Sequence, residues 1–592
     1  MQRPSDDIQL LLAHADDHTP VLEEGLSHDA ADDEAKSEPE SYSFYSYSAG
    51  GNDLAEQGWS VIAPEGERGD RLLAAIRPLI DARHAEMDLA PKIYRVPAKM
   101  DAADADAWRR DVYDSDDPAE MPYYQLFLGD LHETPLALQQ AQTIDGAVGR
   151  LAFSELEDYE AYVDKLLRWE RAPIERAADL LFHTVRDGTP ATSIGASGLV
   201  APVLARSQES LASGALPAAA IREGGSDDPS PDELLRAVAD LEASLLFTVS
   251  HGEGAPRRGW GSDDERRAGQ GAMSFGRSGA IRGEDVAEAS FMPGGMWFMF
   301  ACYGAGTPSD SRFRHWLQLL RDAGKFSGRP EAVLRSLPGE GEAPFIAAVP
   351  KAALANPKGP IAFLGHLDLA WTYSFQELDR GGREGRAGKF FKVLRSLIRG
   401  DRVGLSLREI VRYYLDKNQA ITDRSDQQRA AEVSGIDLGD QRAQLAHLWM
   451  VRQDLAGYTI LGDPAARLPH TPRPRARPTP KPSAPEELRS QQAPQAQAQA
   501  QQAPLQEVPQ AEPVQEKQAQ QAQQAQVPAP TPAPELSAEE TARREAAVHE
   551  VIVGDLGIRK LAEKYGVDRS ELERWHAAYT EAGRRALAKL SS

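Results

Sequence analysis

The sequence predicts an α/β fold with a mainly parallel sheet flanked by helices. Amphipathic helical patterns separate short apolar runs, each bounded by Gly, Asp or Pro; these runs are 123–130, 180–188, 245–252, 296–304, 344–350, 360–366 and 458–464. Apolar runs of this length are typical of strands buried on both faces. One helical pattern, at 312–324, spaces its apolar side chains at i, i+3, i+4 and i+7. The alternation of the two patterns is typical of α/β proteins.

Length and charge limit what kind of protein this is. The 592 residues include 66 basic and 90 acidic side chains, a net charge of -24. A chain this long is expected to form several domains. The acidic balance argues against broad binding to nucleic acid or to anionic membranes. Neither a secretory signal nor a run of about 18 apolar residues is found, so a cytoplasmic protein with no membrane contact is expected.

Composition changes along the chain predict five regions. These are an acidic, disordered tail (1–51), an N-terminal α/β region packing on the next domain (52–170), the main α/β domain (171–468), a Pro/Gln/Ala-rich linker (469–536) and a small all-α domain (537–592). The tail is expected to be disordered because its acidic composition buries too little apolar surface to offset its ordering entropy. Within the last region, a helix, a Gly-containing turn, Asp568 as a cap and a second helix form a helix-turn-helix pattern.

Two of the apolar runs end in reactive side chains. The run at 245–249 leads to Ser250-His251-Gly252, and the run at 296–300 leads to Ala301-Cys302-Tyr303-Gly304. Open α/β sheets place their chemistry at the carboxyl ends of strands. A cysteine attacks carbonyls as a thiolate, and a nearby imidazole can accept and donate the proton. Because Cys302 is the single cysteine, an intramolecular disulfide framework is excluded, and the choice is between a buried, inert thiol and a nucleophile.

The order and spacing of these residues resemble those of the caspase-like cysteine peptidases, and more closely the bacterial CHAT branch of that clan. His-Gly is followed 51 residues later by Ala-Cys-x-Gly, and the segments "GPIAFLGHLDLAWTYSF" (359–375) and "YTILGDPAARLP" (458–469) are similar to segments of such proteins. The resemblance covers roughly residues 170–468. It implies that Cys302 is the nucleophile and His251 the acid/base partner, that the backbone N–H groups of Gly252 and Cys302 form an oxyanion hole, and that the substrate is a protein.

Specificity stays open at this point. Relatives that cut after Arg or Lys often carry an acid two residues before the cysteine, where this chain has Phe300. Caspases hold an aspartate with arginines, and Arg257 and Arg258 are candidates for that role. His366 and Asp368 are further candidates for lining the substrate site, although packing is the favoured interpretation of both. The ligand spacings of metal sites and the phosphate-binding loop motif are absent, so no metal or cofactor is expected.

The C-terminal stretch "LAEKYGVDRSELERWHAAYTEAGRRALA" resembles a transposase-type helix-turn-helix. Residues 541–592 hold 10 basic and 8 acidic side chains, which is a weak electrostatic footprint for DNA. A partner protein is therefore the favoured ligand of 537–592, and DNA the less favoured one. Two functions remain: a cysteine endopeptidase, for which the resemblance implies bacterial defence or regulated proteolysis, and a catalytically inactive caspase-like scaffold or DNA-linked regulator acting through this helical domain.

Overall fold

The computed structural model describes residues 9–22, 25 and 51–470, except 88–89, 114–120, 173, 323, 325–328, 340, 380–381, 437 and 439–441, and a few positions between 564 and 575. The predicted linker beyond residue 470 lies outside the described residues. The predicted helix-turn-helix domain also lies outside them, apart from those few positions.

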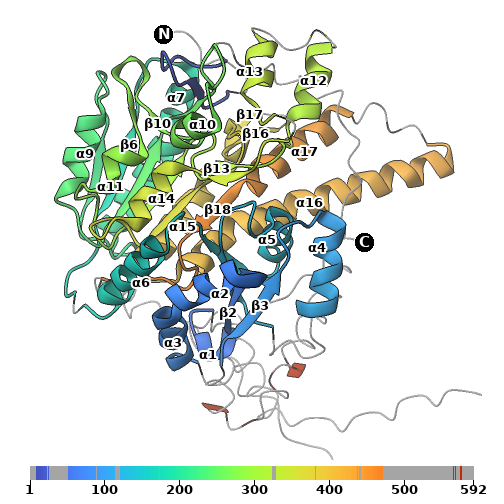
Figure 1. Cartoon of the computed structure of the whole chain (residues 1–592). Helices are drawn as coiled ribbons and strands as arrows, with labels where there is room; N and C mark the ends of the chain where they lie inside the picture. The colour runs from blue at the N-terminus through green and yellow to red at the C-terminus, as the bar shows by residue number, and fades with distance from the viewer. Residues whose placement is uncertain are drawn as a thin grey trace, which may run out of the picture.

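A ten-stranded sheet forms the centre of the molecule (Figure 1). Its strands, in spatial order, are β3 (Lys92–Val96), β2 (Trp59–Pro64), β4 (Tyr124–Leu128), β5 (Ala147–Leu151), β18 (Tyr458–Leu461), β15 (Ala362–His366), β12 (Met296–Phe300), β8 (Leu245–Val249), β6 (Leu180–Thr184) and β7 (Ile221–Gly224). Only β15 and β18 pair antiparallel within this sheet. The predicted α/β fold with a mainly parallel sheet is confirmed.

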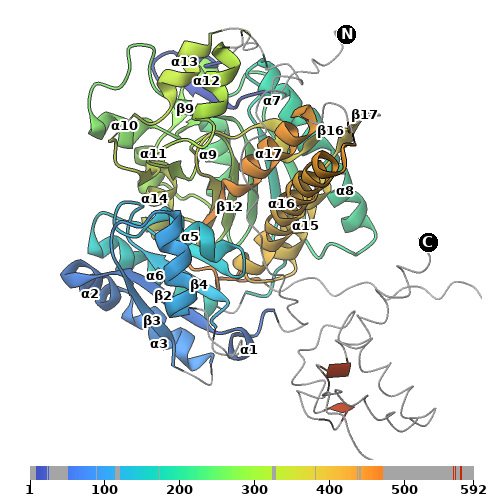
Figure 2. The same cartoon turned by 90° about the vertical axis from the view of Figure 1, so that its right-hand side faces the viewer.

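Helices flank the sheet, and the long helix α16 packs against α15 and α17 (Figure 2). The helices are α1 (Leu54–Gln57), α2 (Gly66–Ala75), α3 (Arg77–Ala85), α4 (Ala102–Trp108), α5 (Leu136–Thr143), α6 (Leu156–Glu170), α7 (Pro190–Ile194), α8 (Ala201–Ala212), α9 (Pro231–Ala239), α10 (Asp263–Gly269), α11 (Gly283–Ala287), α12 (Arg314–Asp322), α13 (Pro330–Ser336), α14 (Ala348–Ala355), α15 (Gly388–Ile398), α16 (Val403–Ser434) and α17 (Arg442–Ala456). Of the described helices, none has the length and apolar character needed to cross a membrane.

Helix α12 shows how the pattern in the sequence becomes packing. Its predicted apolar positions Trp316, Leu317 and Leu320 are all buried. The run at 344–350 was expected to be a strand of the sheet and is not one. It supplies only the two-residue strand β14 (Phe345–Ile346), paired with β13 (Gly306–Thr307), and then enters α14. A short apolar run cannot be told from a buried helix start by periodicity alone.

The regions 52–170 and 171–468 share one sheet. The last strand, β18, lies between β5 of the first region and β15 of the second. Asp463, two residues after β18, is fully buried and accepts hydrogen bonds from Trp59 Nε1 at 3.0 Å and Arg83 Nε at 2.8 Å. The first region therefore extends the sheet rather than only packing on the second.

The structure corrects the expectation of a wholly disordered tail. Residues 9–22 contain strand β1 (Leu12–His14), and Leu10, Leu11 and Leu12 are fully buried. The physical reason is local: the apolar segment Leu10–Ala13 buries its side chains, although the tail as a whole is acidic. Strand β1 joins a small second sheet with β9 (His251–Gly254), β10 (Met273–Ser274) and β11 (Ala280–Ile281). In Figure 1 this dark-blue segment lies near α7 and α10, far from α1–α3, which follow it in sequence.

Candidate active site

His251 and Cys302 are placed by two neighbouring parallel strands. Val249 at the end of β8 pairs with Phe300 at the end of β12, so both chains leave the sheet at the same edge. His251 and Cys302 each follow two residues after those strand ends, and both are fully buried. Gly252 lies directly on the Cys302 peptide: a Cβ added to Gly252 would stand 1.8 Å from the Cys302 carbonyl oxygen. Only glycine fits this close approach of two backbones.

One ring nitrogen of His251 is held by a hydroxyl and the other is open. Nε2 lies 2.9 Å from Thr189 Oγ1, and that hydroxyl donates to Asp187 Oδ1 at 2.8 Å. A hydroxyl that donates to the carboxylate must accept from the ring, which assigns the ring proton to Nε2. Asp187 Oδ2 stands 3.8 Å from Nε2, too far for a direct hydrogen bond. Nδ1 has no hydrogen-bond partner among the residues that the structure describes.

The protonation of His251 follows from its surroundings. Burial disfavours the imidazolium and lowers the pKa of His251, and the negative charge of Asp187 opposes this only in part. At neutral pH the ring is therefore uncharged, with a lone pair on Nδ1. A neutral imidazole with an open nitrogen can accept a proton.

The Cys302 thiol lies against both backbone groups of Ala370. Sγ accepts a hydrogen bond from the Ala370 N–H at 3.1 Å, and the Ala370 carbonyl oxygen lies 3.5 Å from Sγ. Burial raises the pKa of Cys302 well above its usual value, while hydrogen bonds from backbone groups, that of Ala370 first, favour the thiolate and offset part of the effect. The buried sulfur is therefore a neutral thiol in this state.

Two backbone N–H groups converge on one carbonyl oxygen beside the thiol. The N–H groups of Gly252 and Cys302 donate to the carbonyl oxygen of Leu11, at 2.9 Å and 3.2 Å. These are the two groups that the sequence resemblance assigned to an oxyanion hole. Donor distances of roughly 2.7–3.1 Å suit stabilisation of a developing oxyanion; the Gly252 distance lies within this range and the Cys302 distance just above it.

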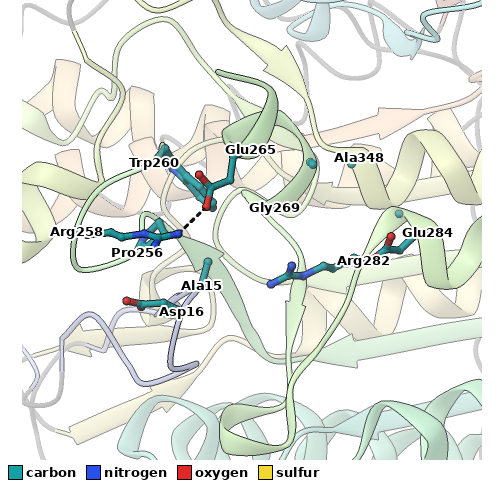
Figure 3. A pocket seen from close by; sticks show the side chains of 12 residues that line it. Ala15, Asp16, Pro256, Arg258, Trp260, Glu265, Gly269, Arg282, Glu284 and Ala348 are labelled. Carbon is teal, nitrogen blue, oxygen red and sulfur yellow. Dashed lines mark hydrogen bonds and ion pairs between the residues drawn. The ribbon is translucent and has the colours of Figure 1, made fainter. Parts of the chain in front are cut away.

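The two arginine candidates do not contact the thiol. Arg257 Nε binds Asp17 at 2.9 Å, and Arg258 binds Glu265 at 3.3 Å. Arg258 lines a pocket of about 310 Å³, together with Asp16 and Arg282 (Figure 3). In Figure 3, Asp16 and Ala15 reach this pocket from the segment that follows β1. The two arginines therefore lie beside residues 16 and 17, which follow Leu11 in the sequence, and not beside Leu11 itself.

Phe300 lies in the core. Its ring is fully buried and packs against Phe375, Phe390 and Tyr458, with ring centroids 5.6, 6.3 and 6.3 Å apart. The Phe300 ring therefore stabilises the core by aromatic packing. It supplies no carboxylate that could bind a basic substrate side chain.

His366 and Asp368 are both buried, and hydrogen bonds occupy their polar atoms. His366 Nε2 lies 2.7 Å from the Asp454 carbonyl oxygen, and Nδ1 lies 3.4 Å from that of Asp368. Burial favours the neutral ring, but hydrogen bonding and the charge of Asp454 outweigh it and raise the pKa of His366. Burial also raises the pKa of Asp368 to about 6, against hydrogen bonds from Ser311 and the backbone of Leu369. Both residues hold the loop that presents Ala370 to the thiol.

Two groups of residues at this site were not predicted from the sequence. Asp187 and Thr189 follow β6, which pairs with β8, so the run "LLFHTVRDGTP" placed an acid at the neighbouring strand end. Asp454 accepts from the Trp371 and Ser374 N–H groups at 2.9 and 2.8 Å, which fixes the backbone after Ala370. Nothing in the sequence pattern singled out Asp454, because it lies within helix α17.

Comparison with known proteins adds little to this geometry. No protein-family model and no curated protein matches the chain. A solved structure titled "Structure of Protease" is similar with a TM-score of 0.37 and 12% sequence identity, over 69% of this chain and 78% of that chain. A likeness this distant assigns neither a family nor an activity to the chain.

Proposed function

We propose that this protein is a cysteine endopeptidase of the caspase-like type, acting on a protein substrate through Cys302 and His251. The observation that carries the proposal is the carbonyl oxygen beside the Cys302 thiol, held by two N–H groups from the neighbouring strand ends. His251 supports it, because its Nδ1 is open and the next residue, Gly252, lies on the Cys302 peptide. An inert core thiol requires neither feature.

The reaction follows from these groups. His251 Nδ1 takes the proton of the Cys302 thiol, and Sγ attacks the peptide carbonyl carbon. The oxygen becomes negatively charged and is stabilised by the N–H groups of Gly252 and Cys302. The carbon–nitrogen bond breaks as the imidazolium returns its proton to the leaving amine. Water, deprotonated by the same ring, then hydrolyses the thioester to a carboxylate and the free thiol.

Thr189 and Asp187 act through His251. The hydroxyl of Thr189 fixes the proton on Nε2, so that Nδ1 is the nitrogen available to the thiol. When the ring becomes an imidazolium, the nearby Asp187 carboxylate stabilises its charge. Both are positioning residues in this scheme.

The test is cleavage of a peptide library by the full chain beside Cys302→Ala and Cys302→Ser. Loss of all cleavage in both variants, with an unchanged thermal melt, is the expected result. A variant that still cuts the same peptides would remove Cys302 from the mechanism.

A further inference from the structure

The segment before β1 lies along the candidate site as an extended peptide. Leu10 forms an antiparallel bridge with Trp371, and the Leu11 N–H donates to the Ala370 carbonyl oxygen at 3.4 Å. One residue earlier, the Gln9 N–H lies 3.5 Å from Thr372 Oγ1. An extended chain added to a strand edge is a common way in which proteins bind peptides.

The Leu11 carbonyl is the group presented to the thiol. Its oxygen accepts from both N–H groups described above, one of which belongs to Cys302 itself. Sγ is three bonds from the Cys302 backbone nitrogen, which donates to this carbonyl oxygen at 3.2 Å. The Leu11 backbone also contributes a hydrogen bond that favours the Cys302 thiolate and thereby lowers its pKa, against the larger effect of burial.

Beyond Leu11 the chain continues along the other side of the site. Leu12, Ala13 and His14 pair in parallel register with Gly252, Glu253 and Gly254. The chain then turns back on itself, since the Val21 N–H donates to the Leu12 carbonyl oxygen at 2.8 Å. The segment therefore crosses the thiol with residues on both sides of the Leu11–Leu12 bond held by the protein.

Polar contacts anchor the downstream part. Asp17 binds Arg257, His18 pairs with the fully buried Glu253, and His14 Nδ1 donates to the Ala255 carbonyl oxygen at 2.9 Å. Glu253 also binds Arg282 at 3.1 Å, at the edge of the pocket in Figure 3. These contacts fix the register in which the Leu11–Leu12 bond meets Cys302.

The Leu11 side chain is fully buried, and the two carboxylates whose charges act on Cys302, those of Asp454 and Asp368, are occupied. Both carboxylate oxygens of Asp454 accept from Trp371 and Ser374, and those of Asp368 accept from neighbouring donors. An uncharged side chain of leucine size thus fits this position, and a charged one would be costly to bury.

We propose that residues 9–14 bind the cleft as a substrate in cis, that the Leu11–Leu12 bond is the bond cut, and that the cleft selects an uncharged, leucine-sized side chain on the acyl side. This inference rests on the proposed function. Sγ bonds to the Leu11 carbonyl carbon, the Leu11–Leu12 bond breaks, and the Leu12 nitrogen takes the proton from His251. Water then releases residues 1–11 with a carboxylate at Leu11, and the remaining chain begins at Leu12.

The test follows the intact mass and the N-terminal sequence of the full-length protein over time. The wild type is expected to lose residues 1–11 and to begin at Leu12, while Cys302→Ala keeps its whole length. Leu11→Asp is expected to slow this step by about 100-fold or more, because a carboxylate is costly to bury. Leu11→Met is the matched control at the same position and is expected to be processed, since Met conserves volume.

A peptide of residues 5–16, "SDDIQLLLAHAD", separates the inference from the proposed function. Leu11→Asp protein is expected to cut this peptide after its second leucine, which shows that its cleft still works. If the wild type cuts library peptides through Cys302 but leaves both this peptide and its own Leu11–Leu12 bond intact, the inference is wrong and the proposed function stands. If no peptide is cut in a Cys302-dependent way, both fail.

Discussion

Two buried histidines, His251 just beyond β8 and His366 at the end of β15, differ in how hydrogen bonds occupy their ring nitrogens. His251 has one nitrogen held by Thr189 and the other open, and burial lowers its pKa. His366 has both nitrogens directed at carbonyl oxygens, and Asp454 raises its pKa. The first has a nitrogen that can exchange a proton with a neighbour, and hydrogen bonds occupy both nitrogens of the second. A buried histidine is a candidate base only where hydrogen bonds leave a nitrogen open.

The largest expected effect separates the two rings directly. His251→Ala should lower kcat/KM for peptide cleavage about a thousandfold, because general acid–base catalysis contributes roughly 10²–10⁴. His366→Gln should lower it only about threefold in properly folded protein, since that ring acts through the loop alone. Steady-state kinetics on the 5–16 peptide measures both, with Leu11→Asp added to every protein so that the uncleaved segment of His251→Ala does not fill the cleft. A comparable loss of kcat/KM in the two variants would show that the two histidines do not differ in their role in catalysis.

Asp454 tests the structural half of the comparison. Asp454→Ala should lower the free energy of unfolding by about 3 kcal/mol, because the buried donors of Trp371 and Ser374 lose their acceptor, while His366 keeps the backbone carbonyl oxygen of residue 454. Asp454→Asn is the matched control and should cost less, since its carbonyl oxygen still accepts. Urea unfolding gives the difference. An Asp454→Ala protein as stable as the wild type would show that this network does not hold the loop.

Thr189 tests how His251 is oriented. Thr189→Val keeps the shape but removes the hydroxyl between Nε2 and Asp187, and should lower kcat about 10–100-fold with little change in KM. Thr189→Ser restores the hydroxyl and should restore most of the rate. If Val and Ser behave alike, the hydroxyl does not position the ring.

The Cys302 thiol should lose its proton only at high pH while residues 9–14 fill the cleft. Burial raises the pKa of Cys302, and only the thiolate is alkylated, so iodoacetamide should react slowly near neutral pH and faster as pH rises. The measurement uses full-length His251→Ala, in which the N-terminal segment stays intact. Adding Leu11→Asp should expose the sulfur and move the midpoint about one unit lower. An unchanged midpoint would mean that residues 9–14 do not cover Cys302.

The sequence pattern predicts the parts of the molecule that local order controls. Apolar runs located β4, β6, β8, β12, β15 and β18, and the strand ends drew attention to His251 and Cys302. His366 and Asp368 were favoured as packing residues, and their hydrogen bonds agree with that interpretation. Phe300 lies in the core, and Arg257 binds Asp17 of the N-terminal segment rather than a group beside the thiol.

The rest depends on contacts between distant parts of the chain. Strand β1 pairs with β9, although about 240 residues separate them, and no local pattern encodes that pairing. The acidic composition of residues 1–51 as a whole predicted disorder and concealed the short apolar segment at 10–13. The insertion of β18 between β5 and β15 likewise brings together strands that are far apart in the sequence, and no local pattern predicts it.

The most direct measurement of the central claim uses a Gln-Leu-Leu peptide carrying an acyloxymethyl ketone, which alkylates an activated thiol. Mass spectrometry identifies the modified residue and its rate of formation in the wild type, His251→Ala and His366→Gln, all three in the Leu11→Asp background so that the N-terminal segment does not cover Cys302. A single adduct on Cys302, formed about 100-fold faster in the wild type and His366→Gln than in His251→Ala, is the predicted result. Equal rates in all three proteins, or no adduct on Cys302, would contradict the claim that His251 activates this thiol.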